Sequence, residues 1–181
     1  MLDNIVLALD IILGSILCAI IFIKLYLRYL GKEEVSTTPD PEFTLLEKSD
    51  THILLQKQIS FRNSGKSCAT IMDAICRPQL PYEQYDKVET CGIAERLGAP
   101  REDNYFESVL IQKKGEAPDE ITILAKVRLT ARKNLSIEEA LKEIPDFNTE
   151  LIWLETGRTP CHYRKIIMRI TGDEIRRLTG I

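Results

Sequence analysis

The sequence predicts a mainly β protein, in which a single N-terminal transmembrane helix precedes an antiparallel β-sandwich with two short helices. Three observations support this fold class. One long apolar run lies near the N-terminus, several short segments alternate apolar and polar residues, and turn-forming residues separate those segments. We expect a transmembrane anchor at 1–30, a polar linker at 31–50 and a soluble β-sandwich domain at 51–181.

The composition argues against some other classes of protein. The chain has 24 Lys and Arg against 27 Asp and Glu, which gives a formal net charge of −3. Proteins that bind nucleic acids usually present a strongly basic face, so we expect no nucleic-acid partner. Hydrophobic residues make up 44% of the chain, enough to build a buried core.

The apolar run extends from Ile5 to Ile23 and contains one charged residue, Asp10. A helix of this length spans about 28 Å, close to the hydrocarbon thickness of a bilayer, and the run has no polar face. We do not expect a cleaved signal peptide, because no basic residue precedes the run and no A-x-A pattern ends it. Asp10 either reaches the headgroups near one end of the span or contacts another helix.

The residues that follow the run predict its orientation. Lys24, Arg28 and Lys32 lie after it, and basic flanks stay on the cytoplasmic side. We therefore expect the C-terminal domain in the cytoplasm. Lys24 and Arg28 can extend to the headgroups, and Tyr26 and Tyr29 suit the interfacial aromatic belt, so these four residues are the expected membrane-interface anchors.

The segment after the anchor is polar and contains Pro39 and Pro41, which is typical of an extended tether. Beyond it, alternation and turn residues predict strands at 53–61, 68–77, 87–91, 105–112, 120–131, 150–156 and 163–171. The segment 120–131 has the clearest pattern, because every second residue from Ile121 is apolar, as in a half-buried antiparallel strand. We expect residues 63–66 to form a hairpin turn and Pro78 to interrupt the chain.

Two short helices are also expected. Ser136 and Glu139 form a capping box that opens a helix at 137–144, which Pro145 ends. Asp173 is expected to cap a second helix at 174–178.

The segment from Ile59 to Ser67 reads ISFRNSGKS. Its strand, Asn-x-Gly turn and second strand resemble the first hairpin of immunoglobulin-like sandwich modules, which implies an immunoglobulin-like sandwich, although no Cys–Trp–Cys spacing is present. Gly65, Lys66 and Ser67 also end this segment like a phosphate-binding loop, but Ser60 replaces its first glycine. An atypical nucleotide-binding enzyme is therefore an alternative, and it depends on whether residues 66–76 form a strand or a helix.

The cysteines show neither zinc nor redox spacing, because no C-x-x-C is present. We expect no metal, no cofactor and no catalytic residue, and free, mostly buried thiols. If the domain instead faced an oxidising space, two disulfides could form, and the chain would be an extracytoplasmic adhesion or envelope domain. The residues concerned are Cys68, Cys76, Cys91 and Cys161.

Two segments are candidates for contacts with a partner. Pro78-x-x-Pro81, followed by Tyr82 and Tyr85, could adopt a polyproline conformation that docks on a partner, or could be a rigid crossover between two sheets.

The second segment is the charged loop at 96–103, with Arg96 and Arg101 as possible contact residues. Taken together, the sequence favours a non-enzymatic interaction or scaffold module, held at the lipid bilayer and binding another protein. It specifies neither the partner nor the oligomeric state.

Overall fold

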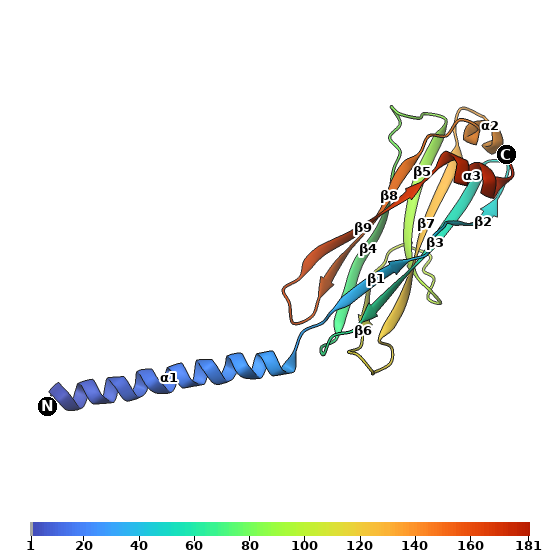
Figure 1. The fold of residues 1–181 in the computed structure, drawn as a ribbon. Helices are drawn as coiled ribbons and strands as arrows, with labels where there is room; N and C mark the ends of the chain where they lie inside the picture. The colour runs from blue at the N-terminus through green and yellow to red at the C-terminus, as the bar shows by residue number, and fades with distance from the viewer. Residues whose placement is uncertain (1) are drawn as a thin grey trace.

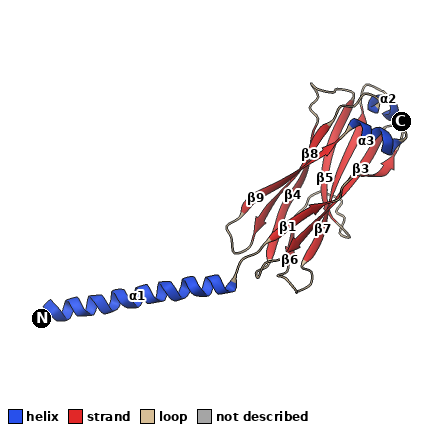
Figure 2. Ribbon diagram, in the orientation of Figure 1, coloured by secondary structure: helices blue, strands red, loops and turns tan. Residues whose placement is uncertain are grey.

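The computed structural model describes residues 2–181, with side chains from residue 9 onward; Met1 of the predicted anchor lies outside the described residues. Helix α1 (Leu2–Leu30) projects from one end of a two-sheet sandwich (Figure 1). Helices α2 (Ile137–Leu141) and α3 (Gly172–Thr179) lie at the opposite end. The remaining elements are strands (Figure 2), so the predicted fold class is confirmed.

All strand pairs are antiparallel. In the first sheet the order is β1-β3-β7-β5, with β2 also paired to β3. Its strands are β1 (Val35–Pro39), β2 (Thr44–Lys48), β3 (His52–Asn63), β5 (Val88–Arg96) and β7 (Glu120–Ala131). In the second sheet the order is β6-β4-β8-β9. Its strands are β4 (Ala69–Gln79), β6 (Ser108–Ile111), β8 (Phe147–Thr156) and β9 (His162–Ile170).

The strand order is that of an immunoglobulin-like sandwich. In constant-type immunoglobulin domains, strands A, B, E and D form one sheet and C, F and G the other. Here β1, β3, β7 and β5 face β4, β8 and β9 in the same chain order, and β2 and β6 are additional. The expected hairpin at 63–66 is wrong, however, because β3 and β4 belong to different sheets and the turn crosses between them.

Alternate residues of both sheets form the core. On β7, all five alternate residues from Ile121 to Leu129 are buried, as the sequence pattern predicts. Phe61 on β3 and Trp153 on β8 connect the two sheets edge to face, with ring centroids 5.0 Å apart. In antibody domains a disulfide joins the two corresponding strands. Here an aromatic pair occupies that place.

The segment 31–50, predicted to be a linker, contains two strands of the sandwich. β1 pairs with β3 from Val35 opposite Asn63 to Pro39 opposite Ile59, and β2 pairs with the other half of β3. Phe43, between β1 and β2, is buried. The polar composition that suggests a tether also suits edge strands, which keep one face in solvent and tolerate proline.

Other strand boundaries differ from the predicted ones. The strand predicted at 105–112 is reduced to β6, whereas β5 continues past residue 91 to Arg96, and β4 continues through Pro78. Strands β4 and β5 approach so closely that a Cβ at Gly92 would lie 2.1 Å from the carbonyl oxygen of Cys76. Gly92 is therefore required by packing, and it is also the residue that weakens the local strand signal.

The two helices begin or end differently from expectation. α2 opens at the predicted capping box but ends at Leu141, short of residue 144. Thr171, and not Asp173, caps α3, because its side chain accepts a hydrogen bond from the backbone N of Glu174. This cap begins the helix at Gly172, two residues earlier than predicted.

Candidate functional site

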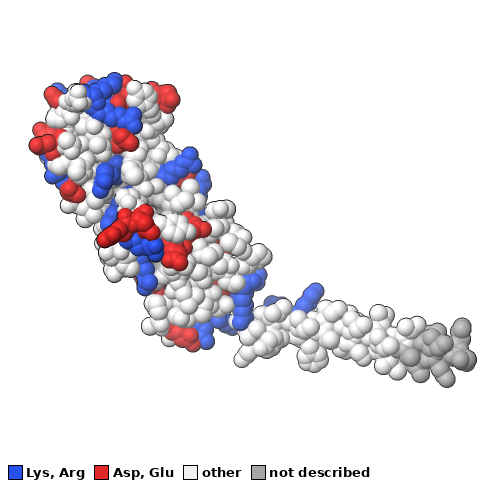
Figure 3. Space-filling model, turned by 180° about the vertical axis from the view of Figure 1, so that it is seen from behind, with Lys and Arg blue, Asp and Glu red and all other residues white. Residues whose placement is uncertain are grey.

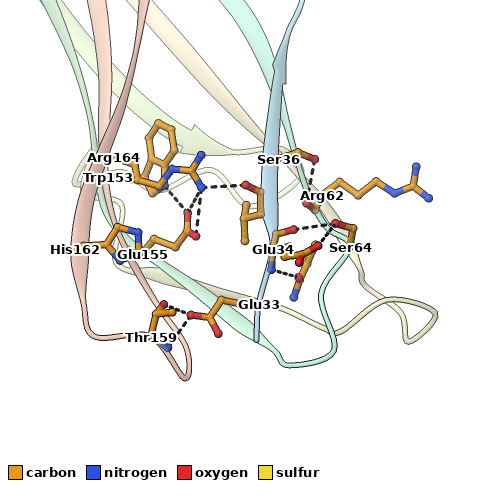
Figure 4. Close-up of polar contacts among 12 residues, drawn as sticks. Glu33, Glu34, Ser36, Arg62, Ser64, Trp153, Glu155, Thr159, His162 and Arg164 are labelled. Carbon is orange, nitrogen blue, oxygen red and sulfur yellow. Dashed lines mark hydrogen bonds and ion pairs between the residues drawn. The ribbon is translucent and has the colours of Figure 1, made fainter. Parts of the chain in front are cut away.

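The end of the sandwich from which α1 emerges contains several groups of polar contacts that lie near one another (Figure 4). Glu33, between α1 and β1, is only 7% exposed. Its carboxylate accepts hydrogen bonds from the backbone N of Arg158 and of Thr159, both at 2.9 Å, and from the Thr159 hydroxyl. Burial raises the pKa of Glu33, but the hydrogen bonds outweigh it and lower the pKa to about 2. Glu33 is therefore ionised and holds the β8–β9 turn.

A second turn contacts the same segment. The backbone N of Lys66, in the β3–β4 turn, donates to the carbonyl oxygen of Lys32 at 2.9 Å. A Cβ at Gly65 would lie 2.4 Å from that oxygen, so Gly65 is required by this close approach. The chain continues from Ser67 into strand β4 and not into a helix. The local geometry that a phosphate-binding loop needs is therefore not found here, and the glycine that suggested one has a packing role.

An ion pair links the two sheets beside the segment that joins α1 to β1. Arg164 on β9 donates to the Glu155 carboxylate at 3.1 Å and to the Val35 carbonyl oxygen of β1 at 2.9 Å (Figure 4). Its guanidinium also lies 5.9 Å from the centroid of the Trp153 ring. Within the part of the chain whose side chains the structure describes, no group of three His, Cys, Asp or Glu could hold a metal ion. The contacts of Lys32, Glu33 and Val35 fix the segment that follows α1 to the sandwich.

The outer face of the second sheet is unusually apolar. The register places Leu154 beside both Met72 and Tyr163, and Ile75 beside Ile152. Exposed fractions reach 57% at Ile75 and 74% at Tyr163. With two further exposed side chains these residues form what we call the sheet-two patch: Met72, Ile75, Leu110, Ile152, Leu154, Tyr163 and Ile167.

The outer face of the first sheet has the opposite character. Its outward-facing pairs include Gln56 with Lys126 and Ser60 with Thr122, and Lys126 also forms an ion pair with Glu95. A solvated antiparallel sheet face is normally polar in this way. A contiguous exposed apolar patch marks an interaction surface on a folded protein. The sheet-two patch is therefore the strongest candidate site.

The sequence reasoning missed this patch, although a signal for it exists. Ile75, Ile152 and Ile167 occupy positions where the alternation calls for polar residues. One apolar residue at a solvent-facing position of a strand does not by itself predict an exposed patch. The register of β4, β8 and β9 is what brings them together.

A hollow of about 410 Å³ opens within the patch, and its lining includes Ile75, Ile152 and Tyr163. A smaller groove of about 230 Å³ lies next to it, between β5 and the segment 99–108, and Tyr105 lines both. The Tyr105 hydroxyl donates to the Asp73 carboxylate at 2.7 Å across a bulge in β4. The patch is therefore hollowed, and not flat, where β4 and β5 approach each other.

The predicted contact residues lie in two separate places. Pro78 is on β4, and the chain from Pro81 to Tyr85 crosses from the second sheet to the first, as one of the two interpretations predicted. The Tyr85 hydroxyl donates to the Ala140 carbonyl oxygen at 2.6 Å, and the exposed Tyr82 ring lies 5.3 Å from the Arg132 guanidinium.

Arg96 and Arg101 line the groove instead. Arg101 forms ion pairs with Asp103 at 2.7 Å and with Glu107 at 3.0 Å. The hydrogen bond to Asp103, first among these contacts, raises the pKa of Arg101, and it lowers the pKa of Asp103 to about 2. The positive charge of Arg101 is therefore already paired with carboxylates of its own loop.

The predicted membrane-interface residues lie on the exposed surface of α1. Residues Leu9–Leu30 form a candidate span of 22 residues, in which an 18-residue window has a mean hydropathy of 2.2 and none of that window is buried against the sandwich. Tyr26 and Tyr29 are 63% and 80% exposed. α1 thus has the length and apolarity of a membrane span or of a signal sequence.

The cysteines are all free thiols, and fewer are buried than expected. Cys76 is buried, Cys68 is half-buried, and Cys91 and Cys161 are exposed. Burial is the main cause that raises the pKa of the Cys76 thiol to about 12. The expectation of mostly buried thiols is wrong because Cys91 faces outward on the edge strand β5 and Cys161 lies in the β8–β9 turn.

No protein-family model matches the sequence, and a search of curated proteins gives no match. Among solved structures, the chain is similar to a Bordetella pertussis protein assigned as ApaA, with 7% identity over 77% of this chain and 94% of that chain, at a TM-score of 0.35. It is also similar to the GAE domain of yeast GGA1, with 8% identity over 71% and 98% of the two chains and a TM-score of 0.31. The GAE domain of GGA2p from Saccharomyces cerevisiae is also similar, with 9% identity over 72% of this chain and 98% of that chain, at a TM-score of 0.29.

Proposed function

We propose that this chain is a non-enzymatic, single-pass membrane protein whose β-sandwich binds another protein through the sheet-two patch. The observation that carries the proposal is the asymmetry between the two outer faces. Ile75, Tyr163 and Ile167 are all more than half exposed on one face. On the other face the outward-facing pairs of β3 and β7 are polar except for Leu54 and Leu124, each of which lies opposite a polar residue and is not exposed. Exposing this much apolar surface is unfavourable in water unless a partner covers it.

The polar residues of this face also suit a protein partner. Lys165, opposite Ile152, and Glu150, opposite Ile167, form an ion pair at 2.7 Å within the patch, and Arg77 lies opposite Glu150 on β4. Protein interfaces combine apolar area with hydrogen-bonding and charged groups. The adjacent groove could accept one side chain of the partner.

The character of α1 supports the membrane anchor. Its apolar surface has no partner within the sandwich, and a bilayer would cover it. Lys24 and Arg28, which follow the apolar run, favour a cytoplasmic sandwich. A domain held at the bilayer gains effective concentration toward partners in the same membrane.

Site-specific photo-crosslinking in cells tests the interaction. A photoreactive residue at Tyr163 of the full chain should form an adduct of discrete mass, and the same residue at Gln58, on the outer face of the first sheet, should not. The substitution Ile75→Lys should weaken the adduct formed from position 163. Equal crosslinking at both positions, or none at position 163, would contradict the proposal, and an adduct of twice the chain mass would indicate self-association.

A membrane-impermeant thiol reagent tests the orientation. Cys91 and Cys161 are exposed in the folded sandwich and should react. Modification only after cell lysis is expected for a cytoplasmic sandwich. Modification in intact cells, or loss of these thiols to disulfides, would favour the extracytoplasmic alternative.

A further inference from the structure

Cationic side chains surround the point where α1 meets the sandwich, and Figure 3 shows Lys and Arg gathered beside it. They come from distant parts of the sequence. Lys32 precedes β1, Lys66 lies in the β3–β4 turn, Lys114 in the β6–β7 turn and Arg158 in the β8–β9 turn. We call these four residues the basic collar.

Hydrogen bonds hold the four segments of the collar together. The backbone N of Lys66 donates to the Lys32 carbonyl oxygen at 2.9 Å, and that of Lys114 donates to the Gly65 carbonyl oxygen at 3.0 Å. The Arg158 guanidinium donates to the Gly31 carbonyl oxygen at 3.3 Å. The backbone segments that bear the four collar residues are thus fixed beside one another at the end of α1.

The charges of the collar are only partly compensated within the protein. Most other cationic side chains of the sandwich form ion pairs, but among residues 9–181 no ion pair includes a collar residue. The nearby acids offset only part of this charge. Glu116 is paired with Lys113 at 2.8 Å, whereas Glu33, Glu34 and Asp119 bond to neutral backbone or hydroxyl groups and keep their negative charge. The four collar cations exceed these three carboxylates by one, and Lys24 and Arg28 at the end of α1 add two further positive charges.

The distance from the apolar run places the end of α1, where the collar begins, just outside the headgroup layer. α1 continues from Lys24 to Leu30 beyond the apolar run, which corresponds to about 10 Å of helix. The headgroup layer of a bilayer is about 5–8 Å thick on each side. Charges at the end of α1 thus lie within about 8 Å of the headgroups, one Debye length at physiological ionic strength.

We propose that the basic collar binds the phosphates of anionic phospholipids, so that the sandwich stands against the membrane by one end. The inference rests on the proposed membrane anchor and adds to it a lipid class and the residues that recognise it. Lysine acts toward phosphate as a point charge and needs no shaped pocket. This contact would leave the sheet-two patch, on the side of the sandwich, free for a protein partner.

Lysine footprinting of the full chain tests this contact. The chain is reconstituted in bilayers of phosphatidylcholine alone and in bilayers with one third phosphatidylglycerol, and acetylation rates are measured by mass spectrometry. Lys66 and Lys114 should react several-fold more slowly in the anionic bilayer, since each basic residue near such a surface favours it by about fivefold. Lys142, at the far end of the sandwich, should react equally in both, and added salt should remove the difference.

A matched pair of variants separates the effect of charge at the collar from the effect of the protein's net charge. The double substitution Lys66→Gln and Lys114→Gln should reduce the preference of the anchored protein for spin-labelled phosphatidylglycerol over phosphatidylcholine. The control, Arg128→Gln with Lys142→Gln, makes the same change of net charge on exposed residues away from the collar and should leave the preference unchanged.

The outcomes test lipid binding by the collar separately from the membrane anchor. Equal acetylation in both bilayers, in a chain that resists alkaline extraction, would refute the collar and leave the anchor intact. Equal effects of the two double variants would also refute it. Extraction of the chain by alkali would refute the membrane anchor, and the collar with it.

Discussion

Replacing Glu33 with glutamine should weaken the contact between the β8–β9 turn and the segment that joins α1 to β1. The Glu33 carboxylate accepts two backbone hydrogen bonds at 2.9 Å and one from the Thr159 hydroxyl. Glutamine keeps one acceptor oxygen but presents an amide NH₂ where the second oxygen stood. That group faces the backbone N–H of Arg158, which then loses its acceptor.

Two lines of reasoning give a similar magnitude. A hydrogen bond to a charged group contributes about 1.5–3 kcal/mol, and the substitution removes one such bond and weakens the others. The same hydrogen bonds lower the pKa of Glu33 from an ordinary 4.5 to about 2, which at about 1.4 kcal/mol per pKa unit corresponds to about 3 kcal/mol. We expect Glu33→Gln to lower the free energy of unfolding by about 2–3 kcal/mol near neutral pH.

The pH dependence has a definite sign. Because folding lowers the pKa of Glu33, its contribution is complete above the ordinary pKa of 4.5 and is lost as the pH falls toward 2. The difference in stability between the wild type and Glu33→Gln should therefore shrink toward zero over that interval. Other carboxylates with lowered pKa affect both proteins alike and cancel in the comparison.

Urea unfolding of the full chain in detergent measures this difference. Trp153 is the single tryptophan and is 1% exposed between the sheets, so its fluorescence reports on the core. The exposed neighbour provides a control, and Glu34→Gln should change stability little. A Glu33→Gln protein as stable as the Glu34→Gln protein, or a stability difference independent of pH, would refute the reasoning.

Three further predictions concern the sandwich itself. Gly92→Ala should lower the thermal midpoint, because its Cβ would lie 2.1 Å from the Cys76 carbonyl oxygen and relieving such overpacking costs about 1–3 kcal/mol; an unchanged midpoint would contradict the close approach of β4 and β5. Ser136→Ala should destabilise the protein by about 1 kcal/mol through loss of the capping box, and Ser136→Asp should recover most of that loss in the same urea assay. Iodoacetamide should modify the exposed Cys91 of the folded protein but not the buried Cys76, whose pKa is raised to about 12, and comparable rates at the two sites would contradict that burial.

Much of the fold is determined by local sequence. The apolar run of α1 has no polar face, and the alternation of β7 marks which side is buried, because both periodicities are properties of a single element. The capping box at Ser136 is likewise complete within four residues and appears in the structure as predicted. The crossover after Pro78 is also indicated locally, by two prolines that limit the backbone.

What depends on distant residues had to come from the tertiary structure. The segment 31–50 has an edge-strand composition that resembles a tether until β3 is placed beside it. Gly65 resembles part of a phosphate loop until the segment after α1 is packed 2.4 Å from its Cβ position. Periodicity indicates which side of one strand is buried, but the neighbours of that strand are set by pairings between residues far apart in the chain. The sheet-two patch and the basic collar each combine side chains from several such strands or turns, and for that reason only the folded chain brings them together.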